Sequence, residues 1–292
     1  MTITEYLKKK KSLIEGFLDK NLPVEDEYPE VIHKAMRYSV FAGGKRLRAI
    51  LCLASNQAVS GCKIDILPIA CALELIHTYS LIHDDLPAID NDNLRRGKPT
   101  NHMVFGENIA LLAGDALLTR AFELCTNAKL RTDILITIIR EISIACGTLG
   151  MIGGQVVDIL SEKKDIDITT LEYIHNHKTG RLISCAVRIG ALANSCSLEE
   201  LAALTRYSQS IGLAFQIVDD ILDEIGDEKV MGKTKHSDSN KEKSTYLKVI
   251  GIEEARKKAK GLIDDAIESL AVFNQEAEPL RLLARYIIMR ES

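Results

Sequence analysis

The sequence predicts an all-α fold, and three observations lead to that prediction. Apolar residues recur at helical spacing along most of the 292-residue chain, and only 6 prolines interrupt them. Thr2, Thr169 and Ser197 each precede a Glu by three positions, a pattern typical of helix starts. Apolar–polar alternation bounded by turn residues, which would predict strands, is absent from the sequence. We expect roughly ten or more helices in a single domain over residues 1–292.

The composition narrows the classes of protein that fit this fold. Apolar residues make up 46% and charged residues 27%, which is typical of a globular domain. The net charge of -4 argues against a nucleic-acid partner, because such proteins are usually basic. No stretch approaches the ~18 consecutive apolar residues of a membrane span. The seven cysteines are scattered and form no CxxC pair, so we expect reduced thiols, no zinc site and a cytoplasmic location.

Local patterns predict the elements in order from the N-terminus. Residues 1–23 predict an amphipathic helix and not a signal peptide, because acidic residues interrupt the apolar ones. The run "ALELIHTYS" at 72–80 predicts a buried helix, which Pro87 is expected to end. Apolar residues at helical spacing after Ser197 predict a long helix that reaches Val218.

Two clusters of aspartates suggest the chemistry, and a polar loop is expected after each, at 87–101 and at 226–246. The members are Asp84, Asp85 and Asp90 in the first cluster and Asp219, Asp220 and Asp223 in the second. Asp90 is expected to turn back toward Asp84, and Asp219 shares a helix face with Asp223. Either cluster alone would fit solvated surface, but two of them 135 residues apart favour a shared role. Because carboxylates suit hard cations, we expect the clusters to face each other across a helical cavity and hold Mg²⁺ around a polyphosphate.

Basic residues near both clusters complete the pattern of an anion site. The candidates are Lys45, Arg46, Arg48, Arg95, Arg96, Lys178, Lys233 and Lys243. Arg binds phosphate oxygens in a bidentate manner, and Lys acts as a mobile point charge. Any one of these residues alone would fit solvated surface. Together they predict two anion sites, one bridged by metal and one purely basic.

With these motifs the sequence resembles the trans-isoprenyl diphosphate synthases, or polyprenyl synthetases, and is most similar to their short-chain bacterial members. The two aspartate clusters match the two aspartate-rich motifs of the family. Further similar segments, in the family's order, are "GGKRLR", "LIHTYSLIHDD", "GGQVVD", "HKTG", "GKTKHSD" and "KSTY". The resemblance covers nearly the whole chain, and the ordered set of motifs is specific.

The resemblance implies an isoprenoid-synthase-type helical bundle around a deep central cavity, assembled as a homodimer. It implies a Mg²⁺-dependent prenyltransferase that condenses isopentenyl diphosphate head-to-tail (1'-4) with dimethylallyl or geranyl diphosphate. About three Mg²⁺ ions per active site are expected with substrate bound, with Mn²⁺ as an alternative. The loop at 226–246 is expected to be mobile and to exclude solvent when it closes.

Carried over position by position, the resemblance implies a role for each candidate residue. The metal ligands would be Asp84, Asp90 and Asp219, with Asp85, Asp220 and Asp223 close by or bound through water. The allylic diphosphate would be held by Arg95, Lys178 and Lys233, with Gln216 and Lys243 nearby. Isopentenyl diphosphate would be held without metal by Lys45, Arg48, His77 and Arg96. Thr179 and Gln216 would direct oxygen dipoles toward the developing allylic cation.

Tyr79 bears on the length of the product. It lies five residues, roughly 7.5 Å of helix rise, before Asp84. In the family that the sequence resembles, a bulky aromatic residue there and a four-residue spacer before the third aspartate accompany farnesyl (C15) products. We therefore expect farnesyl diphosphate, with geranylgeranyl (C20) and geranyl (C10) diphosphate as alternatives. An ordinary core aromatic is the plainer interpretation of Tyr79.

Three other functions fit less well. A phosphohydrolase of the HD type would use His83 beside Asp84, but it leaves the second aspartate cluster unexplained. A terpene cyclase would not need the basic isopentenyl site, and a non-catalytic partner subunit should have lost an aspartate or an arginine. The sequence departs from the commonest family pattern at Asn91, Asn93, Arg181, Lys235 and His236, which bears on metal affinity and loop behaviour.

Overall fold

The structure is a computed structural model that describes residues 2–61, 64–225 and 245–289. Contacts between Cα atoms divide the chain into two compact units. The N-terminal unit comprises Thr2–Ile50 and Asp65–Arg131, and the C-terminal unit comprises Leu51–Ile64 and Thr132–Ser292. The single domain expected over residues 1–292 stays a prediction.

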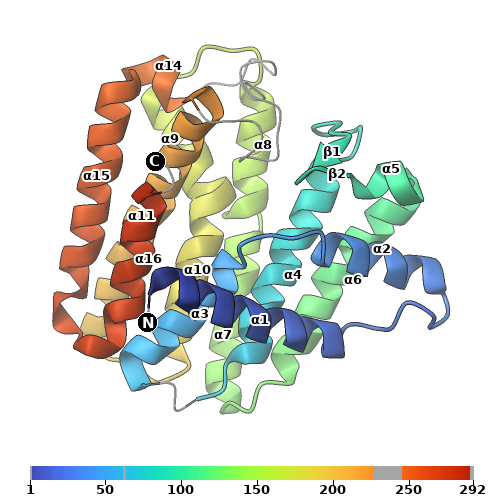
Figure 1. The fold of residues 1–292 in the computed structure, drawn as a ribbon, viewed down its shortest axis with the longest axis horizontal. Coiled ribbons are helices and arrows are strands. Elements are labelled where there is room, and N and C mark those ends of the chain that lie inside the picture. The colour runs from blue at the N-terminus through green and yellow to red at the C-terminus, as the bar shows by residue number, and fades with distance from the viewer. Residues whose placement is uncertain (1, 62–63, 226–244, 290–292) are drawn as a thin grey trace. The chain divides into compact units, whose positions relative to one another are not determined.

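The N-terminal unit consists of helices and one short hairpin, coloured blue to green in Figure 1. Its elements are α1 (Ile3–Asn21), α2 (Glu30–Val40), the start of α3 (Leu47–Ser60), α4 (Leu67–Asp84), β1 (Leu94–Arg95), β2 (Lys98–Pro99), α5 (Asn101–Phe105) and α6 (Glu107–Thr126). The strands pair antiparallel, with Leu94 opposite Pro99. The loop expected at 87–101 therefore contains a hairpin. Strands of two residues are too short to show an alternating pattern, so the sequence does not predict them.

α4 lies in the core of the N-terminal unit. Every residue from Pro68 to Ile76 is buried, as expected for a helix covered on all sides. α6 packs along α4, and α1 and α2 also contact it (Figure 1). The buried carboxylate of Glu74 accepts the N–H of Ala49 at 3.0 Å, which satisfies a free donor at the start of α3. This bond holds the turn of α3 that carries Arg48.

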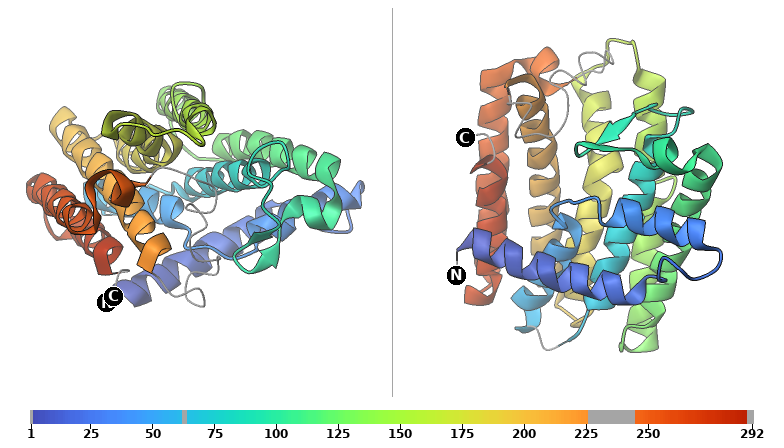
Figure 2. Two further views of the ribbon diagram at one scale, coloured as in Figure 1. Left: turned by 90° about the horizontal axis from the view of Figure 1, so that it is seen from above. Right: turned by 45° about the vertical axis from the view of Figure 1, so that its right-hand side comes forward.

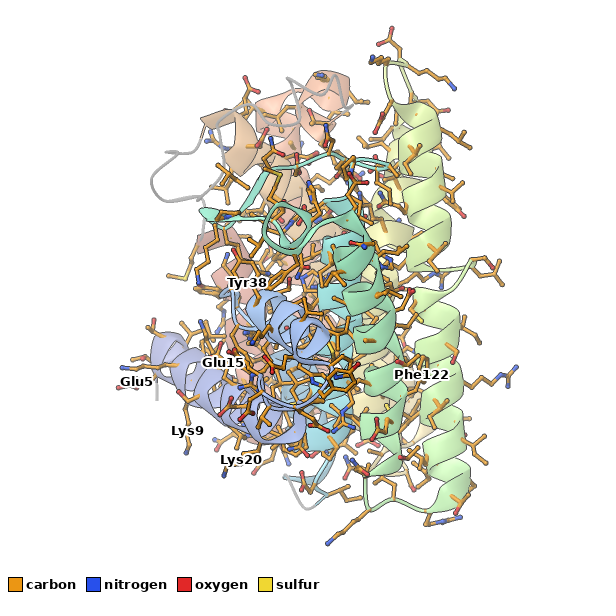
Figure 3. All side chains as sticks on the ribbon, turned by 90° about the vertical axis from the view of Figure 1, so that its right-hand side faces the viewer. Glu5, Lys9, Glu15, Lys20, Tyr38 and Phe122 are labelled. Carbon is orange, nitrogen blue, oxygen red and sulfur yellow. The ribbon has the colours of Figure 1, made fainter. Side chains whose placement is uncertain are left out.

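The amphipathic helix predicted at the N-terminus is confirmed as α1. The side chain of Glu5 accepts the N–H of Thr2 at 2.8 Å, and the Thr2 hydroxyl accepts the N–H of Glu5, so the predicted capping box is present. Its buried side chains are Tyr6, Ile14 and Leu18. Lys9 and Lys20 project outward from the exposed side of this helix (Figure 3).

All regular elements in the described residues of the C-terminal unit are helical. Its elements are the rest of α3, α7 (Thr132–Cys146), α8 (Met151–Ser161), α9 (Ile168–Ile174), a π-helical segment η1 (His175–Gly180), α10 (Arg181–Leu192), α11 (Leu198–Ile225), α14 (Tyr246–Ile250), α15 (Ile252–Ser269), η2 (Leu270–Val272), η3 (Gln275–Ala277) and α16 (Glu278–Met289). The long helix predicted after Ser197 is confirmed as α11, which packs against α10 and α15 (Figure 2). The Tyr207 hydroxyl donates to the carbonyl of Leu280 at 2.7 Å and links α11 to α16.

The helix start expected at Thr169 is wrong. α9 begins at Ile168, and its N-cap is Asp167, whose side chain accepts the N–H of Thr170 at 2.8 Å. Asp caps a helix at least as well as Thr does, so the local sequence offered two starts. Glu172, the expected partner of Thr169, instead bonds to Lys258 and to the Tyr246 hydroxyl.

The expected loop at 226–246 falls almost entirely outside the described residues. At its end, however, Tyr246 is fully buried and is the first residue of α14. The segment "KSTY" therefore ends in a helix start and not in an exposed loop. The Thr245 side chain caps this helix by accepting the N–H of Lys248.

One helical stretch of the described chain, Thr132–Ser161, is long and apolar enough to cross a bilayer by length and composition alone. A turn at residues 147–150 separates it into α7 and α8. Core helices of soluble proteins pass the same test, so a single such stretch is a weak indication of a membrane span.

Candidate active site

The first aspartate cluster follows the end of α4. The helix ends at Asp84, with Asp85 as its C-cap, two residues before Pro87 as predicted. The chain then turns, and the N–H of Asp90 donates to the carbonyl of Asp84 at 2.8 Å. The backbone thus confirms that Asp90 returns to Asp84. Asn91 comes next with φ 51°, a left-handed conformation that Asn adopts more readily than most residues, which accounts for the departure at this position.

Arg95 and Asp85 form a buried ion pair within the N-terminal unit. Arg95 Nε donates to the two Asp85 oxygens at 2.8 and 2.9 Å, and Nη2 lies 2.7 Å from Oδ1. Burial raises the pKa of Asp85, although the hydrogen bonds from Arg95 oppose this. Burial also acts to lower the pKa of Arg95, but the bonds to Asp85 outweigh it and leave that pKa raised. The pair ties the hairpin to the end of α4 and holds Arg95 beside the aspartates.

Two predicted isopentenyl diphosphate ligands, Arg48 and Arg96, lie near enough to His77 on α4 for their charges to act on its ring. Burial and then the charges of Arg48 and Arg96 hold the pKa of His77 well below its usual range. The imidazole is therefore neutral, and the positive charge comes from the guanidinium groups. Lys45 is exposed on the loop that precedes α3.

Gly44 lets Arg96 approach this loop closely. A Cβ atom at Gly44 would lie 2.8 Å from Arg96 Nη1, and φ of +123° is itself unfavourable for other residues. Arg96 Nη1 also donates to the carbonyl of Gly43. The Gly-Gly pair of "FAGGKRLRA" therefore serves the position of Arg96, which lies 52 residues further along the chain.

Arg46 is among the basic residues predicted to bind anions, but its guanidinium group is bonded within the protein, although its charge still acts on His77 and Arg96. It is 3% exposed and donates to Glu15 at 3.0 and 3.2 Å and to the carbonyl of Val40 at 2.6 Å. A buried guanidinium with these partners links α1 to α2. The local sequence does not show that Arg46 is the buried one, because Arg46 and Arg48 follow the same glycines; the resemblance alone selects Arg48 for the site.

The second aspartate cluster lies near the end of α11 in the C-terminal unit. Asp219 and Asp223 are partly exposed and one helical turn apart, as predicted. Asp220 points inward, is 9% exposed, and accepts the N–H of Tyr246 at 2.8 Å. One oxygen of Asp220 is thus used to hold the start of α14 against α11.

The motif "HKTG" forms the π-helical segment η1, a conformation often found at functional sites. Lys178 Nζ lies 2.8 Å from Asp158 Oδ2 on α8. The Thr179 hydroxyl donates to Gln216 Oε1 at 3.2 Å. The two residues predicted to face the allylic cation are therefore brought together.

Asp158 and Gly154 contact Lys178, and no role was predicted for either residue, although both stand in the motif "GGQVVD". A Cβ atom at Gly154 would lie 2.2 Å from the backbone nitrogen of Lys178, so α8 and η1 touch at this glycine. Asp158 follows one helical turn later and reaches the Lys178 side chain. The four-residue spacing from Gly154 to Asp158 is the signal that could have predicted that both residues face Lys178.

Several predicted residues stay untested. Lys233, Lys243 and the departures at Lys235 and His236 lie outside the described residues. Arg181 is exposed, and its Nη2 lies 3.4 Å from His177 Nε2.

The donors that are present fit Mg²⁺. Within the described part of the chain, no three His, Cys, Asp or Glu side chains are close enough to hold a metal by themselves. Mg²⁺ usually takes one or two protein carboxylates and completes its shell with water and substrate phosphates. The half-exposed carboxylates of Asp84, Asp90 and Asp219 therefore suit an ion that binds together with a diphosphate.

The model of the polyprenyl synthetase family matches residues 29–280. This chain belongs to that family. A dimethylallyltranstransferase from Fischerella ambigua is 48% identical over 99% of this chain and 84% of its own length. A geranylgeranyl diphosphate synthase from Cyanophora paradoxa is 46% identical over 98% of this chain and 96% of its own.

Two solved structures show the same fold. An FPP/GFPP synthase from Zymomonas mobilis has a TM-score of 0.87 at 37% identity, over 98% of each chain. A geranylgeranyl pyrophosphate synthetase from Pyrococcus horikoshii has a TM-score of 0.90 at 32% identity, over 99% of this chain and 98% of its own. The predicted all-α, isoprenoid-synthase-type fold is confirmed, and this polyprenyl synthetase is a short-chain prenyltransferase. The roles assigned to single residues stay predictions.

Proposed function

We propose that this polyprenyl synthetase condenses isopentenyl diphosphate (1'-4) with dimethylallyl and then geranyl diphosphate, and releases farnesyl diphosphate (C15). The observation that carries the C15 product is the position of Tyr79. Its ring is 6% exposed in the core helix α4, five residues before Asp84. Because protein interiors are close-packed, a ring fixed there limits the room for a longer product.

In the proposed reaction, the allylic C–O bond breaks and diphosphate leaves with the bonding electrons. Mg²⁺ held by Asp84, Asp90 and Asp219 would neutralise the charge that develops on this leaving group. The fixed positive charge of Lys178 would stabilise the leaving group in the same way. The Thr179 hydroxyl donates a hydrogen bond to Gln216 Oε1, so the lone pairs of the Thr179 oxygen remain for the developing allylic cation.

The second substrate must be anchored without being ionised. The double bond of isopentenyl diphosphate adds to the cation, and the released diphosphate takes up a proton from the adduct, which restores a double bond. Arg48 and Arg96 around the neutral His77 supply a metal-free diphosphate site that does not activate the C–O bond. Lys45 would join them from the exposed loop.

A C20 product is the alternative that a specific observation favours. The relative from Cyanophora paradoxa, which covers nearly the same length as this chain, is named a geranylgeranyl diphosphate synthase. In the proposal, whether the enzyme makes the C15 or the C20 product depends on whether one more isoprene unit fits beside Tyr79.

Product analysis tests the proposal. The purified chain is incubated with Mg²⁺, isopentenyl diphosphate and each allylic diphosphate in turn, and the products are measured by mass spectrometry. We expect C15 from the wild type and from Tyr79→Phe, which keeps the ring, and longer products from Tyr79→Ala. A wild-type C20 product would contradict the chain length, and failure to elongate any allylic substrate would reject the synthase function.

We also propose the homodimer that the resemblance implies. It is supported by exposed apolar side chains on α7 and α8, namely Ile136, Ile144, Ile152, Val156, Ile159 and Leu160. Light scattering should give about twice the chain mass of 32.3 kDa, whereas a monomer mass would contradict the dimer. The cytoplasmic location stays a prediction.

A further inference from the structure

The imidazole of His83 sits directly on a glycine of the neighbouring helix, next to the first aspartate cluster. A Cβ atom at Gly114 of α6 would lie 2.1 Å from His83 Nε2, 2.5 Å from Cδ2 and 2.9 Å from Cε1. Gly114 is buried, so no side chain there could turn into solvent. The ring position of His83 therefore requires glycine at residue 114.

A hydrogen bond fixes the orientation of this ring. His83 Nε2 lies 3.0 Å from the carbonyl oxygen of Leu111, also on α6. Since a carbonyl only accepts, Nε2 carries the proton and donates it. The contact with Gly114 and this bond together hold the imidazole between α4 and α6.

The fixed imidazole in turn supports the ring of Tyr79. The two residues are one helical turn apart on α4, and their ring centroids lie 5.7 Å apart at an interplanar angle of 78°. This is the edge-to-face arrangement that aromatic pairs prefer. Tyr79 is buried, so its ring cannot turn toward α6 while His83 fills that space.

We infer that His83 and Gly114 are positioning residues that set the product length by holding Tyr79 in place. The inference rests on the proposed function, in which the Tyr79 ring limits growth of the isoprenoid chain. A smaller side chain at residue 83, or a larger one at 114, removes the imidazole from the edge of Tyr79. The ring of Tyr79 then gains room to rotate, and one more isoprene unit fits.

His83→Ala and Gly114→Ala test this inference by the ratio of C20 to C15 products. We expect the ratio to rise roughly two- to tenfold in each variant, the range for loss of one edge-to-face contact. Gly16→Ala on α1 is the matched control, because a Cβ atom there meets nothing within 4 Å, and it should leave the ratio unchanged. Melting temperatures are recorded for all variants; if Gly114→Ala does not fold, His83→Ala carries the test, since it only removes atoms.

The double variant Tyr79→Ala/His83→Ala separates positioning from an independent effect. If His83 acts through Tyr79, the double variant gives the same product profile as Tyr79→Ala alone. A further lengthening in the double variant would overturn the inference. An unchanged ratio of C20 to C15 products in His83→Ala would also overturn the inference if Tyr79→Ala lengthens the product. In that case the proposed function would stand. An unchanged product from Tyr79→Ala itself would reject the proposed origin of chain length together with this inference.

Discussion

At the scale of single residues, two cations of the candidate site, Arg95 and Lys178, already have anionic partners that hold them in place. Arg95 is held by the buried Asp85 in the N-terminal unit, and Lys178 is held by Asp158 in the C-terminal unit. Such pairs reduce the side-chain entropy that a cation loses when it binds a phosphate. The mixture of acid and base that marks this sequence therefore also orders the site before any substrate binds.

His175 provides a test of stability against pH. Burial lowers the pKa of His175 to about 4, with smaller effects from Asp158 and Lys178. Because of this lowered pKa, His175 takes up a proton more readily in the unfolded chain than in the folded protein. Its contribution to the free energy of unfolding is therefore complete above about pH 6.5 and is lost as the pH falls toward 4. We expect this group to cost on the order of 3 kcal/mol of stability between pH 7 and pH 4.

Urea unfolding at a series of pH values between 7 and 4 measures this loss. His175→Gln should show a shallower fall in the free energy of unfolding, and His33→Gln on α2 should fall like the wild type. The pKa of His77 is also lowered, so His77 adds to the loss of stability at low pH. It does so equally in the wild type and in both variants. Equal slopes for the wild type and His175→Gln would contradict the assignment.

At the scale of elements, the contact between α8 and η1 positions Lys178. The two elements touch at Gly154, and the backbone atoms opposite it belong to Lys178 and His177. A π-helical segment shifts the register of the residues after it relative to a regular helix. Both features serve the same segment, which carries Lys178 and Thr179.

Gly154→Ala should disturb this packing. The new Cβ atom would lie 2.2 Å from a backbone nitrogen that has no rotamer to move into, so we expect roughly 1–3 kcal/mol of destabilisation. The turnover rate should fall as well, because Lys178 moves with the backbone. Gly261→Ala on α15 is the control: it has open space, and it should keep full activity and equal or higher stability. Urea unfolding and product formation measure both effects, and a Gly154→Ala protein with wild-type values would show that the contact is not needed.

At the scale of the whole molecule, each compact unit carries one aspartate cluster, and the proposed chemistry uses both. Mg²⁺ together with inorganic diphosphate should therefore raise the melting temperature, because a ligand that binds only the folded state stabilises it. The gain is about 2.7 kcal/mol at 100 times the dissociation constant. EDTA should remove the shift.

Variants of either cluster should weaken this shift. Asp84→Asn in the N-terminal unit and Asp219→Asn in the C-terminal unit should each reduce it, since each removes a carboxylate charge from the proposed metal ligands. Asp265→Asn, on the exposed side of α15, is the charge-matched control. A full shift in either test variant would show that the ligand does not depend on that cluster.

The site divides into features that the sequence predicted and features that it did not. The return of Asp90 to Asp84 was predictable because Pro87 ends the helix within the same short segment. The burial of Arg46 was not, because its partner Glu15 lies 31 residues away. The inward position of Asp220 was not predictable either, because its partner Tyr246 lies 26 residues further on.

The sequence by itself determined the all-α class, the order of the motifs and the prenyltransferase family, because helical periodicity and motif spacing are local properties. Tertiary structure alone decided which residue begins α9, which arginine is buried, and which glycines make room for Arg96, Lys178 and His83. The physical reason is that these outcomes depend on close packing between helices distant in sequence, where the space for one methyl group decides which side chain fits.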